Sequence, residues 1–180
     1  NPRIFMFYVE KVWLVPLQSW YDDKQYSEFS LYLEKKGTTD RTDDMWGDFF
    51  HTRWPSVTVP LAEYFAQLNE PFLNWNYDAP VISFSHFLPR QELIFSSDME
   101  RSLLAKIFDP HPEFNFSRVA GSLRIHDQIR RLGSQVHVYG HQHRNRTRNL
   151  GGVTYVSHCM GYPKERAMGY VKADASEPRC

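Results

Sequence analysis

The sequence lacks several features that define common protein classes. Its 180 residues include only two cysteines, Cys159 and Cys180, whose positions indicate no disulfide framework. A reducing compartment is therefore expected, which favours an intracellular, cytoplasmic location. No apolar run approaches the roughly 18 residues of a membrane span, and no signal peptide is recognisable. We therefore expect no membrane partner.

The chain also has no excess of charge of either sign, because 21 basic residues balance 21 acidic ones. General binders of nucleic acid carry a basic surface, so nucleic acid is not an expected partner. A glycine-rich phosphate loop, a G-x-S-x-G elbow and a C-x-x-C pair are all absent from the sequence. These absences argue against the catalytic schemes that depend on each motif.

The residues that are present predict one folded domain over 1–180. Hydrophobic residues make up 42% of the chain and aromatic residues 16%, which is enough for a sizeable core. Strands alternating with helices predict an α/β or α+β layered fold. Strand patterns occupy 4–17, 79–86, 135–140 and 152–163, helix patterns 22–36, 60–68 and 117–132, and 34–55 is interpreted as a surface loop or lid. The chain opens with Asn1 rather than Met, which indicates a processed chain or a fragment.

Two histidines follow the predicted strand at 135–140, in the stretch VHVYGHQHRNR. His141 and His143 stand two positions apart, a spacing that puts both side chains on one side of an extended segment. Converging imidazoles can bind zinc, manganese or iron. Gly140, just before them, is expected to let the backbone turn sharply or approach a ligand closely. The alternative is an exposed polar turn whose histidines have no function.

His86 ends another predicted buried strand, after VISFS. Functional groups of open sheets gather beyond the carboxyl ends of the strands, so we expect His86 to join His141 and His143 at one metal site. A histidine in this position is otherwise a core residue with satisfied hydrogen bonds, which is our interpretation of His137. His158 also follows a strand pattern, and its role stays open.

Arginines surround these histidines in the sequence. Guanidinium groups bind phosphate through a planar fork of donors. Arg144, directly after His143, and Arg90, four residues past His86, are therefore the candidate substrate-binding residues. Arg146 and Arg148 adjoin them, and for each arginine the alternative is a solvated side chain.

Three stretches, VISFSHFLPR, VHVYGHQHRNR and GVTYVSHCMGYPKER, together resemble the C-terminal half of the calcineurin-like metallophosphoesterases. The resemblance implies a β-sandwich flanked by helices, with a dinuclear centre of manganese, zinc or iron at the strand ends. His86 and His141 would ligate one metal and His143 the other. It also implies a hydrolase whose substrate is a phosphate ester.

The earlier motifs of that family, D-x-H, G-D-x-x-D and G-N-H-D/E, are absent from this chain. They supply the bridging aspartate and the catalytic histidine, so no catalytic residue is assigned here. We expect a metal-dependent phosphoesterase represented by its C-terminal half, with little activity in this chain alone. The alternative is a non-catalytic binding or scaffold module of the same fold. The oligomeric state is not indicated.

Overall fold

The structure, a computed structural model, describes residues 7–9, 11–23, 27–54, 56–95, 111–169 and 171. Six strands form one sheet in the order β1-β2-β3-β4-β6-β5. β2 (Val12–Pro16), β3 (Val81–Phe84), β4 (Val136–Val138) and β6 (Val153–Ser157) run parallel to one another. The edge strands β1 (Phe7–Val9) and β5 (Arg146–Leu150) pair antiparallel with β2 and β6. The expected mixed α/β class is confirmed.

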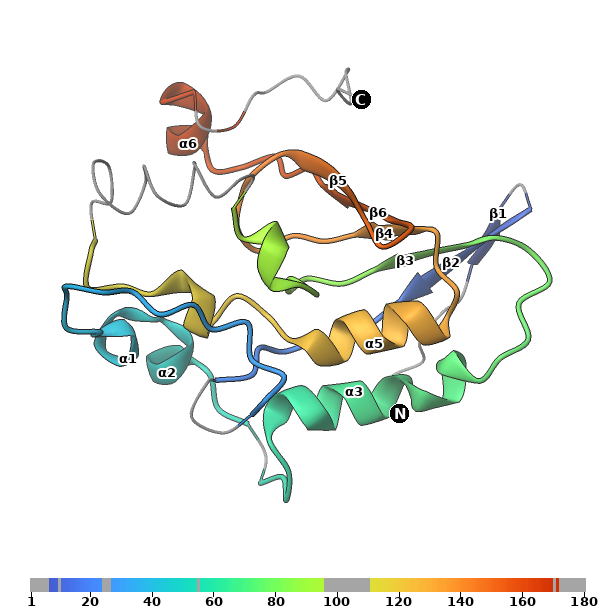
Figure 1. Cartoon of the computed structure of the whole chain (residues 1–180), viewed down its shortest axis with the longest axis horizontal. Coiled ribbons are helices and arrows are strands. Elements are labelled where there is room, and N and C mark those ends of the chain that lie inside the picture. Colours follow the sequence, from blue (N-terminus) through green and yellow to red (C-terminus); the bar gives the residue numbers. More distant parts are fainter. Residues whose placement is uncertain are drawn as a thin grey trace.

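The two main helices lie on one side of this sheet (Figure 1). α5 (Leu123–Arg131) lies next to the strands, and α3 (Leu61–Leu73) packs alongside it. α5 begins at Ser122, whose hydroxyl accepts a hydrogen bond from the amide of Arg124. It ends before Gly133, which has a φ of 62° and so terminates the helix in the left-handed region.

Several predicted elements have different limits in the structure. The segment before α5 forms the short helix η2 (Phe116–Arg118), so the helix expected from 117 starts later. The expected lid at 34–55 contains α1 (Thr42–Met45) and α2 (Asp48–His51). Two further short helices, η1 (Gln91–Leu93) and α6 (Pro163–Ala167), complete the described elements.

The helix expected over 22–36 is wrong for the part of that range that is described. Residues 27–36 contain no helix, and Ser30 forms an isolated bridge with Ser122 instead. The amide of Leu33 donates to the hydroxyl of Ser117 at 2.8 Å. Backbone donors in this segment therefore find partners elsewhere in the fold, which removes the need for helical hydrogen bonds.

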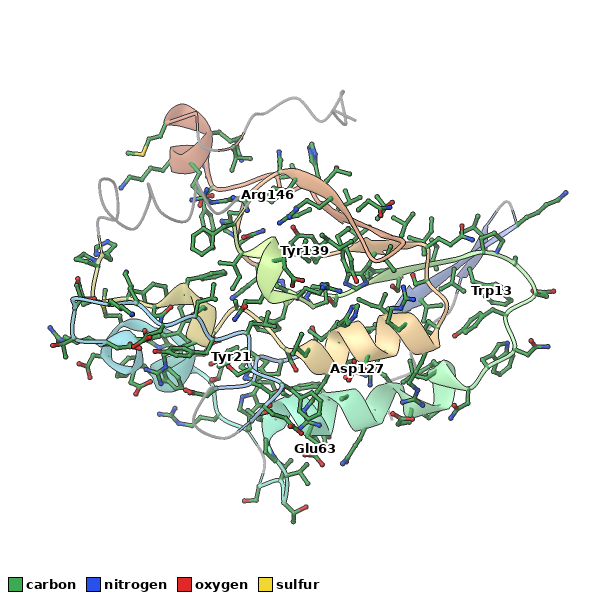
Figure 2. The ribbon with its side chains drawn as sticks, viewed as in Figure 1. Trp13, Tyr21, Glu63, Asp127, Tyr139 and Arg146 are labelled. Atoms are coloured by element: carbon green, nitrogen blue, oxygen red, sulfur yellow. The ribbon has the colours of Figure 1, made fainter. Side chains whose placement is uncertain are left out.

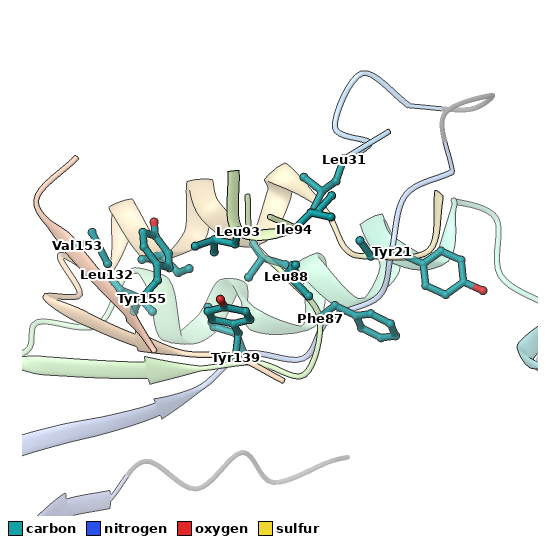
Figure 3. Packing of buried hydrophobic residues seen from close by; sticks show 14 of the residues in the cluster. Tyr21, Leu31, Phe87, Leu88, Leu93, Ile94, Leu132, Tyr139, Val153 and Tyr155 are labelled. Atoms are coloured by element: carbon teal, nitrogen blue, oxygen red, sulfur yellow. The ribbon is translucent and has the colours of Figure 1, made fainter. Parts of the chain in front are cut away.

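The core lies between the sheet and α5. Val15 of β2, Val81 of β3 and Tyr155 of β6 are buried on the side of the sheet that faces this helix. Ile125 and Ile129 of the helix belong to the same buried cluster. Figure 3 shows part of this buried cluster, which continues past the strand ends to the aromatic rings around the candidate site. The apolar residues on one face of each strand thus hold the parallel strands in register.

The opposite face of the sheet is also apolar. We call it the outer face; the pairing register places Leu14, Ile82, Phe84, Val136, Val138 and Val156 on it. Phe84 is 40% exposed and Val138 is 38% exposed. A sandwich needs a second sheet, and none is present in the ranges given above, so the expected β-sandwich is not confirmed. None of the helices in those ranges is both long enough and apolar enough to cross a membrane.

Candidate functional site

The candidate site lies where β3 and β4 end side by side. Phe84 pairs with Val138, and two residues farther along, the amide of Gly140 donates to the carbonyl of His86 at 3.0 Å. Figure 2 shows Tyr139, just before Gly140, well away from Trp13, which lies near the start of β2. The parallel pairing therefore places His86 and His141 at the same edge of the sheet, where the strands end.

At this edge His86 and His141 meet directly. The Nε2 atom of His86 lies 3.2 Å from the Nδ1 atom of His141. The other ring nitrogen of His141, Nε2, lies 2.9 Å from the carbonyl oxygen of Val119. A carbonyl can only accept, so this nitrogen carries the proton, and the lone pair of His141 is on Nδ1, facing His86.

Aromatic rings enclose His141. Its ring stacks on Phe116 with centroids 5.3 Å apart, and Phe87 and Trp46 pack against it at 4.6 Å and 5.5 Å. This burial, together with the neighbouring His86, lowers the pKa of His141 to about 3. The imidazole is therefore neutral at physiological pH, which is the form that binds a metal ion.

His86 is more exposed than its partner. Partial burial of the ring and the nearby His143 lower its pKa, while the carboxylate of Asp48 opposes that shift. His86 therefore also favours the neutral form near neutral pH, next to an acidic residue contributed by α2.

The backbone of this turn is unusual at the histidines themselves. His141 and His143 have φ values of 72° and 51°, in the left-handed region that non-glycine residues seldom adopt. Such conformations cost free energy and concentrate at functional sites. The left-handed residues are thus the histidines rather than Gly140, where an added Cβ would lie 3.5 Å from the nearest atoms of His86.

His143 turns away from the pair and toward α6. Its Nδ1 atom lies 2.9 Å and 3.1 Å from the two carboxylate oxygens of Glu165. Within the described ranges, no three histidine, cysteine, aspartate or glutamate side chains form a group that could hold a metal ion. The structure thus brings His86 and His141 together but does not complete the expected three-histidine cluster.

Glu165 is a site residue that the sequence analysis misses. Its carboxylate also accepts a hydrogen bond from the amide of Tyr162 at 2.6 Å, at the start of α6. A proline at the first position of a helix followed by glutamate at the third is a helix-start signal, and Pro163 and Glu165 match it. That signal could have placed a carboxylate just after the strand that ends near His158.

The candidate substrate-binding arginines differ in their surroundings. Arg90 forms an ion pair with Glu92, and its Nη1 lies 3.3 Å from the Nε2 of His126. Arg146 donates a hydrogen bond to the carbonyl of Ile94, and Arg148 donates one to the carbonyl of Phe95. The two arginines therefore hold the segment after η1 against β5. Arg144 follows His143 directly and is exposed.

An open pocket with a volume of about 490 Å³ is lined by residues that contact the neighbours of the histidine pair, although neither histidine lines it. Asp48 and Tyr21 line it, and both are linked to the pair: Asp48 acts on His86, and Tyr21 packs on Phe87 with centroids 5.5 Å apart. Figure 3 shows Tyr21 and Phe87 next to each other at one end of the buried cluster. The edge of the sheet therefore offers both polar nitrogens and an adjoining cavity.

A comparison with solved structures finds one described as a phosphopantetheinyl hydrolase from Mycobacterium tuberculosis. The two share 19% sequence identity with a TM-score of 0.60, and the match covers 99% of this chain but 61% of the other. At this identity the likeness shows the fold alone, and the chain spans less than two thirds of the structure it matches. No protein-family model and no curated protein matches the chain.

These comparisons contradict the resemblance to calcineurin-like metallophosphoesterases. No model of that family matches, and the similar structure is described as a phosphopantetheinyl hydrolase. The three stretches that suggest the resemblance are short strand ends with histidines. Such a pattern arises wherever parallel strands carry polar groups to one edge, so it is less specific than it looks.

Proposed function

We propose that this chain provides part of the site of a metal-dependent phosphoesterase, in which His86 and His141 hold a divalent ion. The observation that carries the proposal is the 3.2 Å separation of His86 Nε2 and His141 Nδ1. Two imidazole nitrogens bound tetrahedrally to zinc at 2.0–2.1 Å lie roughly 3.3 Å apart. The pair therefore fits two ligand positions of one ion.

The hydrogen bonds behind the histidines support the same proposal. Metal-binding histidines usually donate their other ring nitrogen to a carbonyl or a carboxylate, which fixes the tautomer. His141 has the carbonyl of Val119 in that position, and His143 has the carboxylate of Glu165. His143 would then present Nε2 as a ligand for a second ion. Manganese, zinc and iron all suit imidazole and carboxylate ligands.

The substrate we propose is a phosphate ester. A bound divalent ion polarises a phosphoryl oxygen and lowers the pKa of bound water. Arg144 would orient the phosphate through its guanidinium fork, since it follows His143 and is exposed. The low pKa of His141, about 3, keeps its lone pair available across the physiological range. The name of the similar structure, a hydrolase, agrees with this class of reaction.

Calorimetric titration of the chain with Zn²⁺ and Mn²⁺ at pH 7.5 tests the proposal. We expect binding that His86→Ala or His141→Ala abolishes. His111→Ala is the matched control, because His111 is an exposed imidazole 3.9 Å from Glu113 and should leave binding unchanged. Equal binding by the wild type and the His141→Ala variant would overturn the assignment.

One observation favours a second function, that of a binding or scaffold module without a metal. The described residues include no cluster of three metal-ligating side chains. An assay with a generic aryl phosphate and added Mn²⁺ separates the two functions. We expect low but measurable turnover that His141→Ala removes, because two ligands hold an ion weakly. No turnover together with no metal binding would favour the module.

A further inference from the structure

The pocket beside the histidine pair has aromatic walls. Trp20 and Trp54 line it and meet edge to face, with ring centroids 5.0 Å apart. Phe65 of α3 supports both rings, at 6.0 Å from Trp20 and 5.4 Å from Trp54. Phe49 of α2 and Leu61 at the start of α3 add further apolar surface. The walls are thus held by ring contacts from three segments of the chain.

Two of the pocket's lining residues are each one side chain away from His141. Tyr21 lines the pocket and packs on Phe87, and Phe87 packs on His141 with centroids 4.6 Å apart. Asp48 lines it as well and accepts a hydrogen bond from Trp46, whose ring lies 5.5 Å from that of His141. A single layer of aromatic side chains therefore separates the pocket lining from the histidine pair.

The charge around the pocket selects against anions. Three carboxylates line it, from Asp22, Asp23 and Asp48. Arg124 pairs with Asp22 and Arg118 with Asp23, while Asp48 accepts a hydrogen bond from the indole of Trp46 at 2.9 Å. The acidic lining therefore retains a net negative charge. None of the described lining residues is basic, so a second phosphate in this pocket would meet that charge.

We propose that this pocket binds an uncharged aromatic group, the alcohol part of the phosphate ester. The proposal rests on the proposed function, which assigns the phosphate to the histidine pair. The volume of the pocket, about 490 Å³, lies within the range of roughly 300–1,000 Å³ that is typical of small-molecule sites. In hydrolysis the phosphorus–oxygen bond to the aromatic alcohol breaks, water supplies the new phosphorus–oxygen bond, and the alcohol leaves with a proton.

Ligand-observed NMR measures the binding of 2-naphthol to the metal-free chain, and this tests the pocket without metal or turnover. Because the ligand would stack on aromatic rings, we expect Trp54→Ala to weaken naphthol binding about 3- to 10-fold. We expect the Trp54→Phe variant, which keeps an aromatic ring, to bind naphthol nearly as well as the wild type. Trp75→Ala is the matched control, because Trp75 is 55% exposed at the end of α3 and does not line the pocket. Thermal unfolding of each variant verifies that it is folded.

The charge selection is tested with 2-naphthalenesulfonate, which presents the same rings with a negative charge. We expect it to bind at least fivefold more weakly than 2-naphthol. Equal or tighter binding of the sulfonate, or unchanged naphthol binding in Trp54→Ala, would overturn the proposal. Naphthol binding that persists in a chain that binds no metal would count against the proposed function alone, so the two failures are distinguishable.

Discussion

His143, in the turn between β4 and β5, faces Glu165 of α6, with Nδ1 of the imidazole 2.9 Å from the carboxylate. The two residues stand 22 positions apart, and the short helix α6 carries the glutamate. Their contact fixes which ring nitrogen of His143 can bind a ligand. The direction in which His143 points is therefore set by a residue outside the strand-end motif.

Glu165→Gln tests this positioning role. The amide keeps a hydrogen bond to Tyr162 but removes the charge that holds the His143 proton, so we expect the affinity for Zn²⁺ to fall about 10- to 100-fold. Calorimetry measures the change. Glu34→Gln, at an exposed position, removes the same charge elsewhere and should leave the affinity unaltered.

His137 makes the stability of the fold depend on pH. It is fully buried between the hydroxyls of Ser83 and Ser85, and burial lowers its pKa to about 3 from an ordinary value of 6.5. Below pH 6.5 the His137 imidazole binds a proton in the unfolded chain, whereas in the folded chain it stays neutral until the pH is near 3. Stability present above pH 6.5 is therefore lost as the pH falls through this window.

We expect the free energy of unfolding to fall by about 2 kcal/mol between pH 7.5 and pH 5 through this histidine. Urea denaturation at both pH values measures it. His137→Asn should give a smaller difference between the two pH values, whatever its effect on stability at pH 7.5. An identical difference in His137→Asn and the wild type would show that another group is responsible.

Arg118 joins three aspartates from two segments of the chain. Its Nη2 lies 2.7 Å from both Asp23 and Asp43, and its Nη1 lies 3.4 Å from Asp40. The arginine side chain is 6% exposed, so its removal leaves carboxylates facing one another without a counter-charge. We expect Arg118→Met to destabilise the fold by about 3–5 kcal/mol in denaturant unfolding.

Arg131→Met supplies the control for that measurement. Arg131 pairs with Glu70 at 2.7 Å, but both side chains are more than two-fifths exposed. Exposed pairs contribute little, so this variant should lose less than about 1 kcal/mol. Similar losses in the two arginine variants would contradict the role given to Arg118.

Because the outer face exposes apolar side chains, we expect it to bind a hydrophobic dye. Phe84→Thr removes its most exposed large side chain and should lower the fluorescence of bound 8-anilinonaphthalene-1-sulfonate. The loss of stability should stay below about 2 kcal/mol, because the ring is only partly buried. Trp75→Thr removes exposed apolar surface far from the outer face, and we expect it to change the fluorescence less.

The strands and the meeting of His86 with His141 could be predicted from the sequence because both follow from local patterns. Alternating or continuous apolar runs mark β3, β4 and β6, and the carboxyl ends of parallel strands share one edge. None of the predicted strands includes β5, because its segment RTRNL has almost no apolar residue. Its pairing with β6 and its contacts to the end of η1 hold it, and neither is visible locally.

The direction of His143 and the aromatic pocket could not be predicted for a similar reason. His143 depends on Glu165, and the pocket depends on Trp20 meeting Trp54 across more than thirty positions of chain. Such contacts are set by tertiary packing rather than by spacing. The two-residue separation of His141 and His143 predicts a shared side only for an extended backbone, and both residues are left-handed.

The parallel pairing of β3 with β4 also determines when the histidine pair can form during folding. His86 and His141 are 55 positions apart, and parallel strands pair only after the long connection between them has closed. Contacts of this kind form slowly and late. A ligand of the pair therefore finds no site in the unfolded chain. It should slow the unfolding rate while leaving the folding rate nearly unchanged.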